Sequence, residues 1–155
     1  MRVHTTRDLK RIATELRVMG DKQLKAEFRK ELRKAARPMV PAVKQAIRAI
    51  PSKRSYSADG LRGTMSSAVK LQVKTAGKQT GVRLRVDGRK MPAHMKSLPS
   101  MVEGKKRWRH PVFGNKEVWV TQDARPYFYQ TVNRLGPATR LNVAKAAEHV
   151  ARKIT

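Results

Sequence analysis

Residues 69–87, VKLQVKTAGKQTGVRLRVD, contain the pattern that decides the fold. Aliphatic side chains occupy every second position of 69–73 and again of 82–86, with polar or charged residues between them. A period of two is typical of a β-strand with one buried face. The AGKQTG segment between the two runs favours a tight connection. The sequence therefore predicts an antiparallel β-hairpin whose six aliphatic side chains share one face.

The other face of this hairpin is expected to be cationic. It carries Lys70, Lys74, Arg83 and Arg85, with Asp87 as its one acid. Like charges that face each other across two strands are unfavourable by a few tenths of a kcal/mol each, up to about 1 kcal/mol. Two explanations stay open: water and counter-ions solvate this face, or an anionic partner covers it.

The N-terminal third has the periodicity of helices. Apolar residues recur at spacings of three and four over 6–19 and again over 21–50. Gly20 followed by Asp21 indicates a helix stop and a new N-cap. Two prolines should break or kink the second stretch near 37–41. The basic residues of these helices either cover solvated exteriors or form a stripe that faces phosphates.

Two stretches are expected to lack regular structure, and a third strand should follow them. Residues 51–66 are rich in Ser, Gly and basic residues, which predicts a mobile loop. Residues 88–106 hold no sustained periodicity and are predicted to form a loop or flap. EVWVT, residues 117–121, has the composition of a strand that closes the sheet.

A helix should end the chain. Asp123 is predicted to cap it, and Pro126 suits its first turn because the fixed φ of proline fits a helix start. Its apolar stripe is interrupted around 136–137, where Gly and Pro occur together.

Together these elements predict an α+β fold, in which long N-terminal and C-terminal helices pack on a small antiparallel β-sheet with an extended flap loop. We expect residues 1–155 to form a single domain. Its parts would be a helical part at 1–50, a loop at 51–66, a sheet with flap at 67–125 and the C-terminal helix at 126–155.

The composition is strongly basic. Thirty-six Lys and Arg against 11 Asp and Glu give a formal net charge of +25, spread along the chain. This excess implies an anionic neighbour or a place where positive charge is tolerated. The absence of cysteine excludes disulfides and thiolate metal sites. Without a secretory signal or an apolar run near the ~18 residues of a membrane span, we expect no membrane partner.

Catalytic chemistry has little support. The four histidines share no ligand-like spacing, and the acidic residues are scarce and scattered. Neither a metal site nor a carboxylate pair for acid–base work is indicated. The glycine-containing segments at 60–63 and 86–90 lack the context of phosphate- or dinucleotide-binding loops and are interpreted as turns. We therefore predict no enzyme activity, no metal and no cofactor.

KKRWRH, residues 105–110, is the sharpest basic and aromatic cluster. In one interpretation its cations contact phosphates beside Trp108. In the other, which we favour, Trp108 anchors a flap on the core or on a neighbouring subunit. Zinc-finger spacing, aromatic RNA-binding strands and an obvious helix-turn-helix are missing, so any DNA contact should be to the backbone.

Several motifs occur in a recognisable order. GLRGTM at 60–65 leads into the hairpin, and MVEG at 101–104, HPVFGN at 110–115 and WVTQDARPYF at 119–128 precede an Ala-rich helix. Over 20–155, this order resembles the tail-component family of tailed bacteriophages, which are minor tail or neck proteins of the head-to-tail junction. The resemblance implies a small sheet packed by a long helix, a ring of copies around the DNA channel, and structural rather than catalytic roles.

At two places, individual residues of this sequence match positions of the family's motifs. Glu103 and Gly104 match a family segment that usually reads Glu-Phe-Gly, but here the aromatic residue is missing and a basic insertion follows. Arg125, Pro126 and Phe128 match the family's helix start.

The first hypothesis is a virion structural protein of the phage neck, a tail-completion or tail-terminator protein assembled in the host cytoplasm. We expect a homo-oligomeric, six-fold ring that binds connector or stopper and tail-tube proteins and contacts packaged DNA without sequence preference. The surface facing DNA or partners would comprise Lys70, Lys74, Arg83, Arg85, Lys105, Lys106, Arg107 and Arg109. The flap and interface anchors would be Trp108, Phe113, Trp119, Pro126 and Phe128. The alternatives are a sequence-nonspecific nucleic-acid-binding protein and, more weakly, a small enzyme or toxin.

Overall fold

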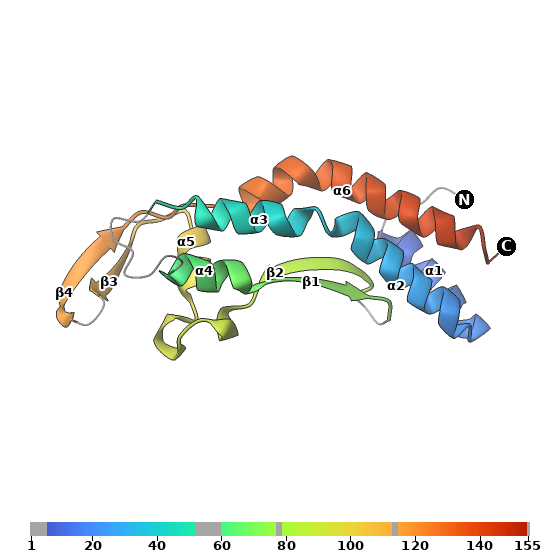
Figure 1. The fold of residues 1–155 in the computed structure, drawn as a ribbon, viewed down its shortest axis with the longest axis horizontal. Helices are drawn as coiled ribbons and strands as arrows, with labels where there is room; N and C mark the ends of the chain where they lie inside the picture. Colours follow the sequence, from blue (N-terminus) through green and yellow to red (C-terminus); the bar gives the residue numbers. More distant parts are fainter. Residues whose placement is uncertain (1–5, 52–59, 77–78, 113–114, 155) are drawn as a thin grey trace. The chain divides into compact units, whose positions relative to one another are not determined.

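The computed structural model describes residues 6–51, 60–76, 79–112 and 115–154. The protein has the predicted α+β fold, with helices and two small antiparallel two-stranded sheets (Figure 1). The elements are α1 (Thr6–Met19), α2 (Lys22–Ala36), α3 (Met39–Arg48), α4 (Gly60–Ser67), β1 (Val69–Lys74), β2 (Gly81–Val86), η1 (Gly88–Lys90), η2 (Ala93–Met95), α5 (Leu98–Glu103), β3 (Trp108–Val112), β4 (Asn115–Gln122) and α6 (Phe128–Ala151).

Contacts between residues divide the chain into two compact units. The first combines Met1–Ala42, Lys70–Arg85 and Asn133–Thr155, and the second combines Val43–Val69 and Val86–Val132. This division does not test whether the chain forms one domain, which stays a prediction.

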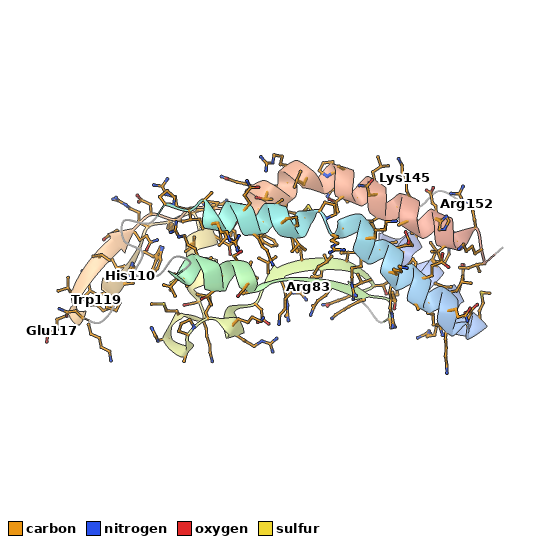
Figure 2. The ribbon with its side chains drawn as sticks, viewed as in Figure 1. Arg83, His110, Glu117, Trp119, Lys145 and Arg152 are labelled. Carbon is orange, nitrogen blue, oxygen red and sulfur yellow. The ribbon has the colours of Figure 1, made fainter. Side chains whose placement is uncertain are left out.

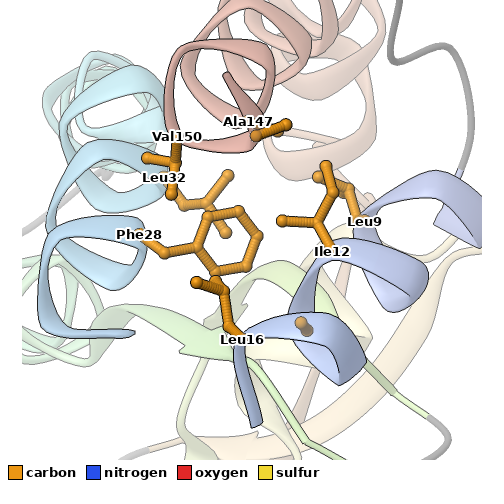
Figure 3. Close-up of a cluster of buried hydrophobic side chains, with 9 residues drawn as sticks. Leu9, Ile12, Leu16, Phe28, Leu32, Ala147 and Val150 are labelled. Carbon is orange, nitrogen blue, oxygen red and sulfur yellow. The ribbon is translucent and has the colours of Figure 1, made fainter. Parts of the chain in front are cut away.

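The first unit has a core made by one face each of α1, α2 and α6 (Figure 3). Ile12, Phe28 and Leu32 have no exposed surface. Burial of a side chain of this size contributes about 1.5–3 kcal/mol. The spacing of three and four therefore predicted the inner helix faces correctly. The labelled core residues in Figure 3 are Leu9, Ile12, Leu16, Phe28, Leu32, Ala147 and Val150.

Strands β1 and β2 form the predicted hairpin. Val73 and Val82 pack against the helical core, whereas Lys74 and Arg83 are exposed. At these four positions the alternation separates an apolar face from a cationic face, as the sequence predicted.

The junctions between the first three helices also follow the sequence. Gly20 ends α1 with a φ of 75°, a conformation that glycine adopts without steric cost. The Oδ1 atom of Asp21 accepts hydrogen bonds from the backbone N–H groups of Gln23 at 2.8 Å and Leu24 at 2.9 Å. The break predicted near 37–41 lies between α2 and α3.

Helix α6 corrects a prediction. It runs without a break through Gly136 and Pro137, where the sequence predicted an interruption. Proline cannot donate a hydrogen bond to the carbonyl of Asn133. Asn133 is exposed, so water can solvate that carbonyl, and the packed residues on both sides keep the helix continuous.

The second unit contains a helix that the sequence analysis missed. Residues 60–67 form α4, so the loop prediction and the GLRG turn are wrong for this segment. The Nη1 atom of Arg62 donates to the carbonyl oxygen of Ile50 at 2.9 Å, and Met65 is buried. These contacts outweigh the low helix propensity of two glycines. Residues 52–59 of the predicted loop lie outside the described part of the chain.

The predicted flap at 88–106 is built mostly from short helices. It contains η1, η2 and α5, which are each too short to produce a recognisable sequence period. The Oδ1 atom of Asp87 caps η1 by accepting from the backbone N–H of Arg89 at 3.3 Å. Met91 and Val102 are buried and hold this segment in the second unit.

The third predicted strand exists but pairs differently. Strand β4 contains 117–121 and forms a separate antiparallel hairpin with β3, not a third strand beside β1 and β2. Residues 110–112, the start of the HPVFGN motif, belong to β3. A five-residue strand with a proline gives little pattern to detect, and Pro111 is compatible with an edge strand. Phe113, one of the predicted anchors, lies outside the described residues.

Candidate interaction surfaces

The β3–β4 hairpin exposes apolar side chains on both faces. Val118 is 49% exposed, Trp119 is 52% exposed and Val120 is 39% exposed. Successive residues of a strand point to opposite faces, so Trp119 faces away from the two valines. Figure 2 shows Trp119 and Glu117 along this hairpin. Exposed apolar clusters typically mark interaction sites, and a lone two-stranded hairpin is marginally stable without a covered face.

Aromatic contacts stiffen the same hairpin. The Trp108 and His110 rings lie 4.5 Å apart, and the Nε2 atom of His110 is 3.1 Å from the Oε1 atom of Gln122 on β4. The Arg109 guanidinium lies 6.0 Å from the centre of the Trp119 ring, a contact worth about 0.5–1 kcal/mol at an exposed site. Trp108 is half-buried, which fits an anchor role better than an open stacking platform.

One carboxylate joins the segments on both sides of this hairpin. Glu103, the last residue of α5, accepts hydrogen bonds from the backbone N–H groups of Tyr127 at 2.8 Å, Phe128 at 2.7 Å and Tyr129 at 2.9 Å. The first N–H groups of a helix have no partner within it, and the N-terminus favours negative charge. We call this arrangement the Glu103 clamp, because it fixes the chain before β3 to the helix after β4.

The clamp replaces the cap that the sequence predicted. Asp123 does not cap α6: its carboxylate pairs with the Arg107 guanidinium at 2.6 Å. The helix begins at Phe128, so Pro126 precedes its first turn. No local signal could have identified Glu103, because it precedes the N–H groups that it caps by 24 to 26 residues.

Aromatic packing surrounds the clamp. Tyr127 is buried, and its hydroxyl donates to the carbonyl oxygen of Pro99 at 3.4 Å. Burial, together with the nearby charge of Glu103, raises the pKa of the Tyr127 hydroxyl well above its usual value. Phe128 meets Tyr127 and Tyr129 edge-on, at ring separations of 6.5 and 5.8 Å. Phe128 is half-buried, and its predicted role as an interface anchor stays a prediction.

The predicted basic surface is divided between the two units. In the first unit Lys74 and Arg83 are exposed, and the Nζ atom of Lys74 donates to the Oε1 atom of Gln79 at 3.1 Å. Lys70 and Arg85 are half-buried and have polar contacts within the protein. Two of these four cations, Lys74 and Arg83, are therefore exposed to solvent.

The cations of the 105–110 segment lie in the second unit. Lys105 and Lys106 are exposed. Arg107 and Arg109 are also exposed, but the first pairs with Asp123 and the second lies against Trp119. Two of these four cations thus already have partners within the second unit.

A pocket of about 230 Å³ lies in the first unit and was not predicted. Helix α1 contributes Lys10, Ala13, Thr14 and Arg17 to its lining, and the connection between β1 and β2 contributes Thr75, Ala76 and Thr80. From the sequence, the cations of the N-terminal helices are expected either to cover solvated exteriors or to form a stripe that faces phosphates. The recurrence of polar residues at 10, 14 and 17 was the sequence feature that could have indicated this pocket.

An ion pair closes the helical core of the first unit at its edge. The Nζ atom of Lys153 donates to the Oε1 atom of Glu27 at 2.5 Å, and the Nε2 atom of His149 lies 3.7 Å from the same oxygen. The hydrogen bond from Lys153, more than any other contact, lowers the pKa of the Glu27 carboxyl.

The described residues contain no group of three His, Cys, Asp or Glu side chains that could hold a metal ion. Among the same residues, no helix has the length and apolar character needed to cross a membrane. Comparisons with protein-family models, curated proteins and solved structures returned no match to this chain.

Proposed function

We propose that this chain is a structural protein of a tailed-phage virion, of the tail-completion or tail-terminator type, and that copies of it form a ring at the head-to-tail junction. The observation that carries the proposal is the β3–β4 hairpin, which exposes apolar side chains on both faces. The order of motifs shared with phage tail components supports the same role.

The hairpin has the properties of an assembly arm. Its base is fixed by the Glu103 clamp, while Val118, Trp119 and Val120 are open to a partner. A second copy of the chain can cover this surface, and its strand edges can pair with a neighbouring strand. If each copy contacts the next through the same two surfaces, the copies close into a ring when the rotation between neighbouring subunits is a whole fraction of a full turn.

The charge of the chain fits a place beside packaged DNA or acidic proteins. A net charge of +25 makes copies repel one another, which opposes a ring unless an anionic neighbour or salt offsets it. Exposed cations such as Lys74 and Arg83 are suited to that contact. The role proposed for them is backbone or surface attraction without sequence selection.

The test is the oligomeric state of the purified chain, measured by light scattering after size-exclusion chromatography in low and high salt. We expect a multi-subunit species in the wild type and its loss in a Val118→Ser, Trp119→Ala double variant. The matched control is Val18→Ser with Leu141→Ala, which removes apolar side chains that are 80% and 56% exposed on helices. Equal effects of the two double variants would show that the hairpin is not the assembly surface.

Sequence-nonspecific nucleic-acid binding is the second candidate, and the open cations Lys74, Arg83, Lys105 and Lys106 favour it. It predicts a monomer that binds duplex DNA with affinity falling steeply as salt rises. A strict monomer with this behaviour, absent from phage particles, would replace the first proposal. A ring that persists after nuclease treatment would exclude DNA as the agent that holds it together.

A further inference from the structure

The pocket of the first unit has the composition of an anion site. Lys10, Thr14 and Arg17 occupy positions i, i+4 and i+7 of α1, which lie on one side of a helix. Thr75 and Thr80 face them from the ends of β1 and β2. None of the seven described residues that line the pocket is acidic.

The charges around this pocket are not neutralised within the described part of the chain. No ion pair of Lys10 or Arg17 with a described carboxylate is found, whereas the neighbouring Arg11 pairs with Glu15 at 3.8 Å. A third cation reaches the lining from α2, where the Nε atom of Arg29 donates to the Oγ1 atom of Thr75 at 2.9 Å. Two basic side chains thus line the pocket, and a third contacts one of its lining residues.

The hydroxyl groups have defined roles. Thr14 donates its hydroxyl hydrogen to the carbonyl oxygen of Lys10 at 2.9 Å, so it has no hydrogen to offer a ligand. Thr75 is the acceptor in its bond with Arg29, which leaves its own hydrogen to donate. An anion in the pocket would therefore find a hydroxyl donor at Thr75 beside the cations.

We propose that this pocket binds a phosphoryl group, through Lys10, Arg17 and the Thr75 hydroxyl. A phosphoryl group presents several oxygens in different directions, which matches donors that come from a helix and a strand end. The forked guanidinium of Arg17 suits two such oxygens. The volume of about 230 Å³ admits the group with part of its hydration shell, since one water occupies about 30 Å³. The group is either free phosphate or a phosphodiester of a nucleic-acid strand, and this site does not depend on the proposed assembly role.

The experiment measures binding of inorganic phosphate and of a 12-nucleotide single-stranded DNA by titration calorimetry and by amide chemical shifts. The decisive variant is Thr75→Val, because it removes the hydroxyl without changing the net charge. A second variant, Lys10→Gln with Arg17→Gln, changes two exposed side chains of α1. Its control is Arg33→Gln with Lys34→Gln, which removes the same charge from exposed positions of α2.

We expect Thr75→Val to weaken binding by a factor of about ten, because hydrogen bonds to charged groups are strong. The Lys10 and Arg17 variant should weaken binding by a factor of about ten more than its control on α2. If both ligands show these losses, the pocket binds free phosphate as well as phosphodiesters; if only the oligonucleotide does, phosphodiesters are its ligand. If Thr75→Val changes neither affinity and the two glutamine pairs are equivalent, the attraction is general and the proposal is overturned.

Discussion

Replacement of Glu103 by alanine should destabilise the protein more than any other change of an exposed or half-exposed acid. The carboxylate accepts three backbone N–H groups at 2.7 to 2.9 Å, at the start of α6. A hydrogen bond to a charged group contributes about 1.5–3 kcal/mol, and loss of a helix cap costs about 0.5–2 kcal/mol. The bond from Tyr129 is exposed, so water can replace it, while the other two are partly buried. Because such terms are not additive, we expect about 2–4 kcal/mol in total.

The assay is urea denaturation followed by circular dichroism, with hydrogen exchange at residues 127–129 as a local readout. Glu103→Gln should lower the free energy of unfolding by about half as much as Glu103→Ala does, because one amide oxygen can still accept hydrogen bonds although the charge is gone. The control is Glu117→Ala on β4, where the side chain is exposed and the change should stay within about 0.5 kcal/mol. The amides of 127–129 should exchange faster in both Glu103 variants than in the control.

A comparison with Asp123→Ala distinguishes the stability contributed by the Glu103 clamp from that contributed by the neighbouring Arg107–Asp123 ion pair. Arg107 and Asp123 lie 2.6 Å apart, but their side chains are 75% and 55% exposed, and exposed pairs typically contribute about 0–1 kcal/mol. Asp123→Ala should therefore cost less than Glu103→Ala. If Asp123→Ala costs more, or if Glu103→Ala matches the Glu117 control, the assignment of the hairpin base to Glu103 is wrong.

Three further predictions concern the substitution of one or two residues. Gly136→Ala should stabilise the protein by about 0.5–1 kcal/mol, since an added Cβ inside α6 meets, among the described residues, only the end of one arginine side chain at 3.9 Å; a lower melting temperature would contradict this. Glu27→Gln should lower stability at neutral pH. Because folding lowers the Glu27 pKa, this difference should shrink as pH falls below the ordinary value of 4.5 and vanish below the lowered pKa of the folded protein, and a difference that persists below it would have another cause. Lys74→Glu with Arg83→Glu should leave the thermal melt unchanged, because both side chains are exposed, but should impair joining of heads to tails in a phage that depends on this chain; normal particle yield would rule out that contact.

Local chemistry was enough to predict the helix junctions and the hairpin of the first unit, but not the unbroken course of α6 through Gly136 and Pro137. The Gly20–Asp21 junction has a helix stop and a cap within four residues, and both depend only on neighbouring backbone groups. The alternation around Val73 and Val82 likewise placed the apolar face of the β1–β2 hairpin on the core. These features are encoded at short range, so a single sequence contains them.

The second unit depends on contacts that sequence patterns do not carry. Helix α4 has weak helix formers, and Arg62 attaches it to the end of α3. The cap of α6 comes from Glu103, while the nearer Asp123 is used by Arg107. Periodicity, propensity and local capping rules all operate within a few residues, so they misassigned these positions in the same way.

The two candidate functions respond to salt in opposite directions. Contact through Val118, Trp119 and Val120 is apolar. It is opposed by electrostatic repulsion between copies that each carry a charge of +25, and 0.1 M salt screens this repulsion at distances beyond about 10 Å. Self-association through the hairpin should therefore strengthen as salt rises. Contact of exposed cations with phosphates should weaken, with a slope of log affinity against log salt of about −0.9 for each phosphate neutralised on duplex DNA. Added salt should strengthen an apolar contact between copies and weaken a contact between cations and phosphates. A salt titration of the oligomeric state therefore distinguishes association through the hairpin from association through a bound polyanion.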